Sequence, residues 1–375
     1  MIKGVCSTTL KNKPFLIIPH PFNDELFSSW LTRVAYAHHF HPQTFINLFF
    51  GIKNRGLFKN NVDAHLSDQM IRNIENMVHN KINIFKLTLR SFSGILREDD
   101  IIDSPSIFLC KLRFCPHCLK ENIPYFKYQW KLAFTTVCIK HRCFLQDVCP
   151  NCKTPLNIFK MYNNTLSFSY CSQCGFDLKK SPTKNIHSKF KTSMSAMDIF
   201  HQGLYQGYIQ LGDSIIYLFC FMDVVTQLSK LILSKRNFAF LHTHPLFLLL
   251  NSAIKKTIKS SQPIHIQLNI VENFALFGLI LYLFENYPNN FAKFVSMNHL
   301  THWDMIRDLR HISFWYETLV NSISPKYVAF GNMVTNEEIK HARHYLLSLG
   351  KLENKANLTQ LFGNINFFNK YQLHR

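Results

Sequence analysis

The sequence lacks long uncharged apolar runs and the features of an export signal. Its most apolar window, residues 214–234, contains Asp223 and Lys230, whereas a helix that crosses lipid needs about 20 mostly apolar residues with almost no charge. Residues 1–20 hold one short apolar patch, Phe15 to Ile18, and a signal peptide needs a longer apolar region and a cleavage site. We therefore expect a protein of the reducing cytoplasm without a membrane span.

Acidic residues are scarce as well. The chain has 23 Asp and Glu against 42 Lys and Arg, which gives a formal net charge of +19 and a pI near 9.5. Such an excess of positive charge favours a polyanionic partner, most often a nucleic acid. The alternative is a general basicity that serves solubility alone.

The few acids form no catalytic pattern. Nucleases and transposases normally hold Mg²⁺ between clustered carboxylates. Asp99, Asp100 and Asp103, for instance, lie in a loop-like stretch without a recognisable motif. The sequence therefore predicts a protein that is not an enzyme and has no catalytic residues.

Apolar and aromatic residues are plentiful. Hydrophobic residues make up 47% of the chain, which carries 35 Phe, 14 Tyr and 4 Trp. This composition excludes a mainly disordered or collagen-like chain. At about 150 residues per domain, the 375 residues correspond to two or three domains.

Two short helices are predicted near the N-terminus. Asn23 is a suitable N-cap for the first, with Asp24 and Glu25 in its first turn. Pro42 suits the first turn of the second, and Gly51 ends it. The first helix is expected to bury a face made of Phe27, Trp30, Leu31 and Val34. The pair is compatible with a helix-turn-helix, although most helical hairpins bind nothing.

Most of the eleven cysteines fall into two sets within residues 110–180. Two ligands at C-x-x-C spacing lie on one tight turn, so that both can reach one ion, and a second pair completes a tetrahedron. The first set is Cys115, Cys118, Cys138 and His141, and the second is Cys149, Cys152, Cys171 and Cys174. We therefore predict two Zn²⁺ ions, both structural, because each set already supplies four protein ligands.

Other pairings of these ligands stay open at this point. Disulfides conflict with a reducing compartment, an iron–sulfur cluster fits poorly with the histidine, and ligands could be shared between the sets as in RING-like folds. The remaining cysteines, Cys6, Cys110, Cys143 and Cys220, are read as ordinary thiols, mostly buried. Surface or hydrogen-bonding roles, rather than ligand roles, are expected for His38, His39, His41 and His117.

Aromatic and basic residues alternate between the ligands of the first set. Lys127 and Lys131 lie among Tyr125, Trp130 and Phe134. Such a mixture can stack on bases and contact phosphates; alternatively, the aromatics form a small core over the metal. Across residues 110–180 there are 11 Lys and Arg against 3 acids, so this region is clearly basic.

The chain is thus expected to be mainly α-helical with small zinc-ribbon β elements. Its predicted parts are an N-terminal helical region with a helix-turn-helix-like hairpin (1–109), a tandem zinc-finger region (110–180) and a helical C-terminal domain (185–375). Within the first part, residues 52–109 read as a polar connector with one or two helices. Thr335 and Glu338 predict a capping box, in a helix that Gly350 ends.

The order of these features is more specific than any one of them. A proline-bearing leader is followed by Asp24-Glu25-Leu26, Ser29-Trp30-Leu31, Arg33, Phe114-Cys115-Pro116-x-Cys118, Trp130, Cys138-x-x-His141, Leu145, Cys149-Pro150-x-Cys152 and Cys171-x-x-Cys174-Gly175. Over about residues 14–180 this order resembles the TniQ family of transposition proteins, which includes TnsD. The C-terminal half is similar to the family only in being helical and basic.

The resemblance implies a non-catalytic role in the bacterial cytoplasm. Members of the family select the target site of cut-and-paste transposons and recruit an AAA+ ATPase regulator, which brings in the transposase. TnsD-like members read an attachment sequence in DNA themselves. CRISPR-associated members join an RNA-guided Cascade complex, often as a dimer. The length of 375 residues, with both cysteine sets intact, favours the CRISPR-associated branch.

Only a few residues carry a role over from the family. The eight ligands transfer as zinc ligands, and Trp30 transfers as a core residue of the helix-turn-helix. Arg33, together with Lys127 and Lys131, is a candidate for contact with a nucleic acid or a protein partner. The alternatives to a Cascade-linked adaptor are a TnsD-like reader of an attachment site and a free-standing zinc-containing DNA-binding regulator.

Overall fold

A computed structural model describes most of the chain. The described residues are 10, 12–51, 62–96, 109–121, 123–161, 167–186, 190–234, 238–250, 268–309, 312–324, 336–352, 354, 357–358 and 361. Cys6, Asp99, Asp100, Asp103 and Thr335 lie outside the described residues. The capping box at Thr335 therefore stays a prediction.

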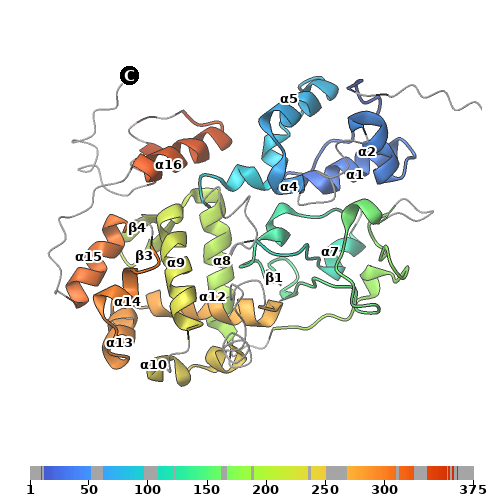
Figure 1. Cartoon of the computed structure of the whole chain (residues 1–375). Coiled ribbons are helices and arrows are strands. Elements are labelled where there is room, and N and C mark those ends of the chain that lie inside the picture. The colour runs from blue at the N-terminus through green and yellow to red at the C-terminus, as the bar shows by residue number, and fades with distance from the viewer. Residues whose placement is uncertain are drawn as a thin grey trace, which may run out of the picture. The chain divides into compact units, whose positions relative to one another are not determined.

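The chain divides into two compact units, each built from three separate stretches (Figure 1). Unit 1 consists of Met1–Ser91, Lys111–Lys131 and Leu145–Thr183. Unit 2 consists of Phe92–Cys110, Leu132–Phe144 and Lys184–Arg375. Each unit is described by itself below.

The helices described in unit 1 are short. The α-helices are α1 (Phe27–Ala37), α2 (Pro42–Phe50), α4 (Val62–His65), α5 (Asp68–Met77) and α7 (Pro116–Lys120). The 3₁₀ turns are η2 (Phe85–Leu87), η3 (Leu89–Phe92, whose last residue belongs to unit 2), η4 (Tyr128–Lys131), η5 (Ile158–Lys160) and η6 (Leu178–Lys180).

Helix α1 begins later than the sequence predicts. Leu26 is its N-cap residue and no side chain caps it, so the prediction that Asn23 caps the helix and that Asp24 and Glu25 lie in its first turn is wrong. The reason is tertiary: Glu25 forms an antiparallel bridge with Lys127, and the amide of Leu26 donates to the carbonyl of Phe126 at 2.9 Å. These backbone contacts hold residues 25 and 26 outside the helix.

Helix α2 follows the prediction closely. Pro42 occupies its first turn, and the His41 side chain caps it by accepting a hydrogen bond from the amide of Gln43 at 3.2 Å. Gly51 ends the helix with φ of 82°, a conformation that costs glycine little because it has no Cβ. The two helices are consecutive and pack on one another; their use as a DNA-reading helix-turn-helix stays a prediction.

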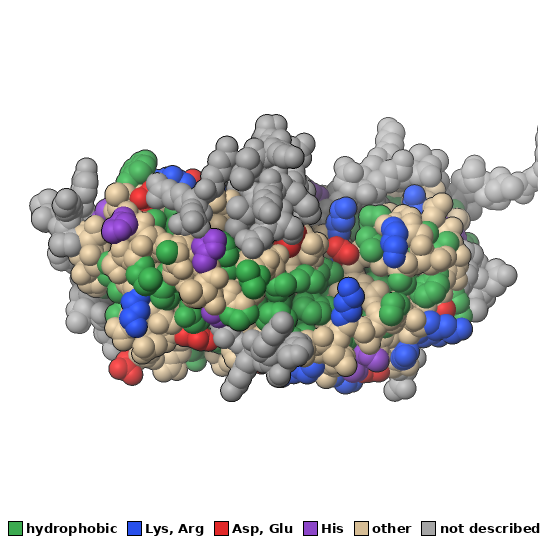
Figure 2. All heavy atoms as spheres, turned by 90° about the horizontal axis from the view of Figure 1, so that it is seen from below, with side chains coloured by type: hydrophobic (Ala, Val, Ile, Leu, Met, Phe, Trp, Pro, Cys, Tyr) green, Lys and Arg blue, Asp and Glu red, His purple; other side chains and the backbone are tan. Residues whose placement is uncertain are grey.

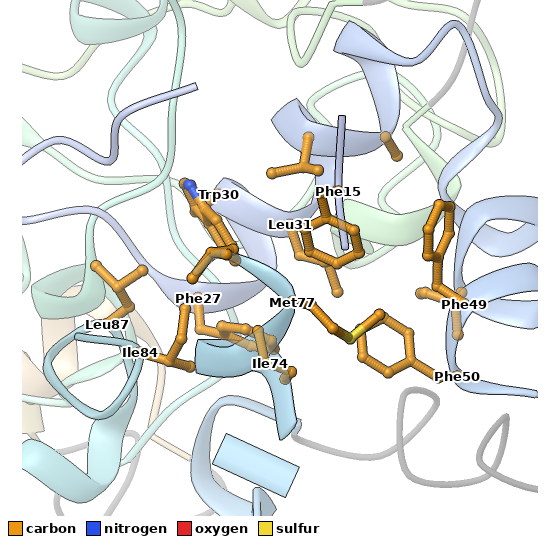
Figure 3. Close-up of a cluster of buried hydrophobic side chains, with 14 of the residues drawn as sticks. Phe15, Phe27, Trp30, Leu31, Phe49, Phe50, Ile74, Met77, Ile84 and Leu87 are labelled. Carbon is orange, nitrogen blue, oxygen red and sulfur yellow. The ribbon is translucent and has the colours of Figure 1, made fainter. Parts of the chain in front are cut away.

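The hydrophobic core of unit 1 gathers residues from α1, α2, α5 and the segment after α5. Figure 3 shows Trp30, Phe27 and Leu31 of α1 facing Ile74 and Met77 of α5. The predicted apolar face of α1 is buried, and burying each large side chain contributes roughly 1.5–3 kcal/mol. Further members of the cluster include Phe15, Phe45, Phe49, Val62, Leu66, Ile71, Val78, Ile82, Ile84 and Leu87. Residues 62–87 are therefore part of this core rather than a polar connector.

Unit 2 is mainly helical where the structure describes it, as predicted. Its helices are α8 (Lys191–Gln206), α9 (Leu218–Ile232), α10 (Ala239–His242), α12 (Ile270–Phe284), α13 (Asn289–Met297), α14 (His302–Ile306), α15 (Phe314–Ile323) and α16 (Asn336–Ser348). Its strands are β1 (Val137–Cys138), β2 (Cys143–Phe144), β3 (Tyr208–Leu211) and β4 (Ser214–Tyr217).

Helix α12 is the centre of unit 2 and packs on both α8 and α9. Its Phe277 is fully buried, with its ring 5.7 Å from that of Phe200 on α8 and 6.0 Å from that of Phe134. Gly278 allows α12 to approach α8, because a Cβ there would lie 2.1 Å from Oγ of Ser193. Packing of apolar helices therefore holds this core together.

A hairpin of β3 and β4 interrupts the helices of unit 2. The strands pair antiparallel from Tyr208↔Tyr217 to Leu211↔Ser214, so Gly212 and Asp213 form a two-residue turn in which Gly212 has φ of 56°. The sequence prediction for this region names only helices and misses the hairpin. A Gly-Asp pair between short apolar runs is a signal that could have found it.

Among the described residues, no single helix is long and apolar enough to cross a membrane. In the described part of the chain, the pair α12 and α13 meets the required length and composition when taken together, and a bend of 106° separates the two helices.

Candidate metal centres

The second cysteine set comes together in unit 1 as one compact group. The four sulfur atoms of Cys149, Cys152, Cys171 and Cys174 all lie within 4.8 Å of one another. Sγ of Cys149 is 3.7 Å from Sγ of Cys174, and Sγ of Cys152 is 3.6 Å from Sγ of Cys171. Four sulfurs at this spacing fit a tetrahedral Zn²⁺ site.

Two tight turns place these sulfurs. In the first, the amide of Lys153 donates to the carbonyl of Cys149 at 2.9 Å. In the second, the amide of Gly175 donates to the carbonyl of Cys171 at 2.9 Å, and Gly175 has φ of 69°. Each C-x-x-C pair therefore lies on one turn, as its spacing predicts, and the glycine supplies the positive φ that the second turn requires.

The thiols of this group fall into two kinds. Hydrogen bonding from Thr154 lowers the pKa of Cys152 to about 6, and a hydrogen bond from the backbone of Phe176 lowers the pKa of Cys174. Burial raises the pKa of Cys149 and Cys171. Zinc binds thiolates and deprotonates a thiol that coordinates it, so the two low-pKa thiols offer the readiest first ligands.

The first set also forms one group. The ligand atoms of Cys115, Cys118, Cys138 and His141 all lie within 4.8 Å of one another. Cys115 precedes α7 and Cys118 lies within it. Cys138 ends β1, and Nδ1 of His141, in the turn that leads to β2, is 3.4 Å from Sγ of Cys138. The ligands are thus gathered in chain order, and not in the crossed arrangement.

Both groups are geometrically compatible with zinc. Each has four protein donors of the thiolate and imidazole kinds that zinc prefers, which is typical of structural rather than catalytic sites. Two of the described cysteines that lie outside both groups are buried elsewhere. Cys143 is buried on β2 opposite Cys138, and the thiol of buried Cys220 lies 3.1 Å from Oε1 of Glu338.

Two histidines of the N-terminal hairpin make hydrogen bonds, as expected. Nε2 of His38 accepts from the amide of Ile17 at 3.2 Å, and His41 caps α2. His39 adopts φ of 56° at the end of α1. None of the three belongs to either metal group.

The three candidate nucleic-acid contacts all lie beside carboxylates within unit 1. Arg33 is 2.5 Å from Oε2 of fully buried Glu25. Nζ of Lys127 is 2.7 Å from Oδ2 of Asp24. Nζ of Lys131 is 3.7 Å from Oδ2 of Asp63, which is buried.

Burial raises the pKa of Glu25 and Asp63, whereas the nearby cations Arg33 and Lys131 oppose that rise. Asp63 also accepts hydrogen bonds from the amide and the hydroxyl of Ser28, at 2.8 and 3.0 Å. Removing one partner of such a buried pair leaves an uncompensated charge and is strongly destabilising. Lys131 therefore joins the segment 125–131 to α4, and Lys127 joins it to Asp24 just before α1. Arg33 joins α1 to Glu25.

The aromatic residues between the ligands form a core, as one of the two readings expects. Trp130 is 2% exposed and Phe134 is fully buried. The ring of Tyr125 stacks on Phe22 at 4.3 Å, and its hydroxyl donates to Oδ1 of Asp24 at 2.8 Å. These rings are engaged in contacts within the protein.

The fold and the site thus define a helical protein with two zinc-compatible groups and an N-terminal helical hairpin tied to the first cysteine-rich segment. The family model of TniQ matches residues 16–145. Residues 16–145 are therefore a TniQ domain, which includes the first metal group. No curated protein matches the chain.

Proposed function

We propose that this protein is a target-selection adaptor of transposition, without enzyme activity of its own. It links a complex bound at the target DNA to an AAA+ ATPase regulator of transposition. The observation that carries this proposal is the TniQ domain over residues 16–145, because the family acts in transposition. The net charge of +19 supports a nucleic acid in the assembly.

The target-bound complex is proposed to be an RNA-guided Cascade complex, with the guide RNA reading the sequence. The length of 375 residues and the two intact cysteine sets support this branch. The two zinc ions are proposed to be structural and to shape the surfaces that partners recognise, and a dimer is compatible with this role. In the alternative, the protein is TnsD-like and reads an attachment site in DNA directly.

A tagged purification from the native host tests the proposal. The protein is captured with and without nuclease treatment, and its partners are identified by mass spectrometry. Cascade subunits that survive DNase support the RNA-guided adaptor. An AAA+ regulator recovered with DNase-sensitive partners alone favours direct reading of DNA. Absence of both from the captured material contradicts a role in transposition.

The Cys149→Ser variant, purified in the same way as the wild type, tests whether the second metal group is needed for partner binding. If the zinc ions shape the partner surface, this variant loses one ion and loses partners in the same purification. Retention of every partner at reduced zinc content contradicts a part for the second metal group in recognition.

A further inference from the structure

Three lysines on α7 and η6 of unit 1 differ in exposure and pairing from the three candidate contacts Arg33, Lys127 and Lys131. Lys120 ends α7, and Lys179 and Lys180 end η6. The two short helices pack against each other. Lys120 and Lys180 are exposed and Lys179 is half-exposed. Three cations are thus held on two adjoining elements of one unit.

Among the described residues, no carboxylate neutralises the charge of these lysines. No ion pair joins Lys120, Lys179 or Lys180 to an acid among the residues that the structure describes. The ammonium of Lys179 lies 5.8 Å above the ring of Tyr170. Asp177, the acid nearest in sequence to η6, accepts a hydrogen bond from the amide of Lys179 at 3.1 Å. On the face in Figure 2, Lys and Arg side chains gather over unit 1.

We propose that Lys120, Lys179 and Lys180 form a surface that contacts the phosphate backbone of duplex DNA, a surface called here the α7–η6 surface. This inference deepens the proposed function, on which it rests for the presence of nucleic acid in the assembly. Exposed lysines neutralise phosphates and release counterions, and they do so without reading sequence.

The kind of nucleic acid follows from which aromatic residues are exposed. Single strands are bound by combining cations with exposed rings on which bases stack. In the described part of unit 1 the exposed large hydrophobic residues are Leu16, Ile17 and Ile123, none of which is aromatic. The half-buried ring of Tyr170 already lies under the ammonium of Lys179. A surface of cations without fully exposed rings fits a duplex, whose bases are already stacked.

The test compares two triple variants of the full chain with equal changes of charge. The first replaces Lys120, Lys179 and Lys180 by Gln. The control replaces Lys13, Lys81 and Lys86, three exposed lysines elsewhere in unit 1, by Gln. Binding to a labelled DNA duplex of mixed sequence is measured over a series of salt concentrations, and zinc content is measured for each protein.

The expected result is a large change for the first variant alone. Each neutralised phosphate contributes about 0.9 to the slope of log affinity against log salt, so the slope falls in magnitude by about 2.7. At about 0.1 M salt the affinity falls on the order of 100-fold. Zinc content and thermal midpoint stay at the wild-type values, which separates lost contact from lost folding.

Three outcomes overturn the α7–η6 surface: equal losses in both variants, no duplex binding by the wild type, or preference for single-stranded DNA or for RNA. Loss of zinc from the first variant also overturns it, because the lysines would then serve to balance the thiolates. These outcomes are independent of the tagged purification. Transposition partners recovered without a lysine effect refute this surface alone, and a lysine effect without such partners refutes the proposed function alone.

Discussion

The finger at residues 149–174 and the helical core of unit 2 are held together by different means. In the finger, turns of one C-x-x-C spacing gather four sulfurs within 4.8 Å, and the described regular structure nearby consists of 3₁₀ turns. In unit 2, α12 buries most of its residues against α8 and α9. The contrast shows a zinc-compatible group of ligands where apolar helices are missing and hydrophobic burial where they are present.

The largest effect is expected for Cys149→Ser, which removes one ligand of the second metal group. Because binding of a structural Zn²⁺ supplies folding free energy of roughly 10–16 kcal/mol, the finger should unfold and the chain should hold one ion fewer. Hydrogen exchange should become fast around residues 149–180 and stay slow in α12. Cys143→Ser, at a buried cysteine outside both metal groups, is the control and should keep the full zinc content. Unchanged zinc in Cys149→Ser would falsify the ligand assignment.

Phe277→Ala removes a buried apolar ring from the helical core of unit 2 and leaves the ligands of both metal groups unchanged. Its fully buried ring contacts Phe200 and Phe134, so its removal leaves a cavity and should cost about 4 kcal/mol of unfolding free energy. Zinc content should not change. Phe314→Ala, at a ring 39% exposed, should cost much less. Chemical unfolding measures both, and a zinc loss in Phe277→Ala would show that the two kinds of order are not separate.

Arg33→Met tests the ion pair under α1. Glu25 would be left buried without its cation, which should cost about 3 kcal/mol. Burial raises the pKa of Glu25 and Arg33 opposes this rise, so in the variant the pKa rises further. A folded-state pKa above the unfolded value makes stability fall as pH increases through it.

The loss in Arg33→Met should therefore be larger at about pH 8 than at about pH 5, because protonation of Glu25 removes the unpaired charge at the lower pH. Urea unfolding at the two pH values measures the difference, and Arg33→Lys, which keeps the charge, should lose less. The salt dependence of DNA binding should keep its slope in Arg33→Met. A reduced slope would mean that Arg33 contacts phosphate after all.

The smallest expected effect is at the start of α12. The Asn269 side chain accepts a hydrogen bond from the amide of Glu272 at 3.0 Å, and Glu272 accepts one from the amide of Asn269 at 2.8 Å. Asn269→Ala removes this cap and should lower stability by about 1 kcal/mol. Asn269→Asp keeps an accepting oxygen and should be nearly neutral. A thermal midpoint that is equal in both variants would contradict the capping role.

What could be predicted from the sequence is what depends on short spacing. Two ligands at C-x-x-C spacing must share a turn, so the grouping of the residues in both zinc-compatible sets could be predicted without a structure. Pro42 and Gly51 likewise fix the ends of α2 by local geometry. The capping box of α12 and the Gly212–Asp213 turn carried local signals of the same kind that the sequence reading overlooked.

What could not be predicted depends on partners far along the chain. Asp24 and Glu25 look like first-turn residues of a helix, but Asp24 lies against Lys127, more than 100 residues away. For the same reason Lys127 and Lys131 look like available cations until Asp24 and Asp63 are placed beside them. The net charge of a sequence gives the excess of cations. It does not show which of these cations are paired with carboxylates and which are exposed without a partner.

The bridge between Glu25 and Lys127 also has a consequence for synthesis of the chain. At about 5–20 residues per second, a ribosome needs roughly 5–20 s to add the residues that separate the two partners. During that interval Asp24 and Asp63 have left, or are leaving, the ribosome without Lys127 and Lys131, the cations that pair with them. The N-terminal part of the nascent chain therefore cannot complete its contacts until residues 125–131 have been made. Chaperones can bind it during this interval.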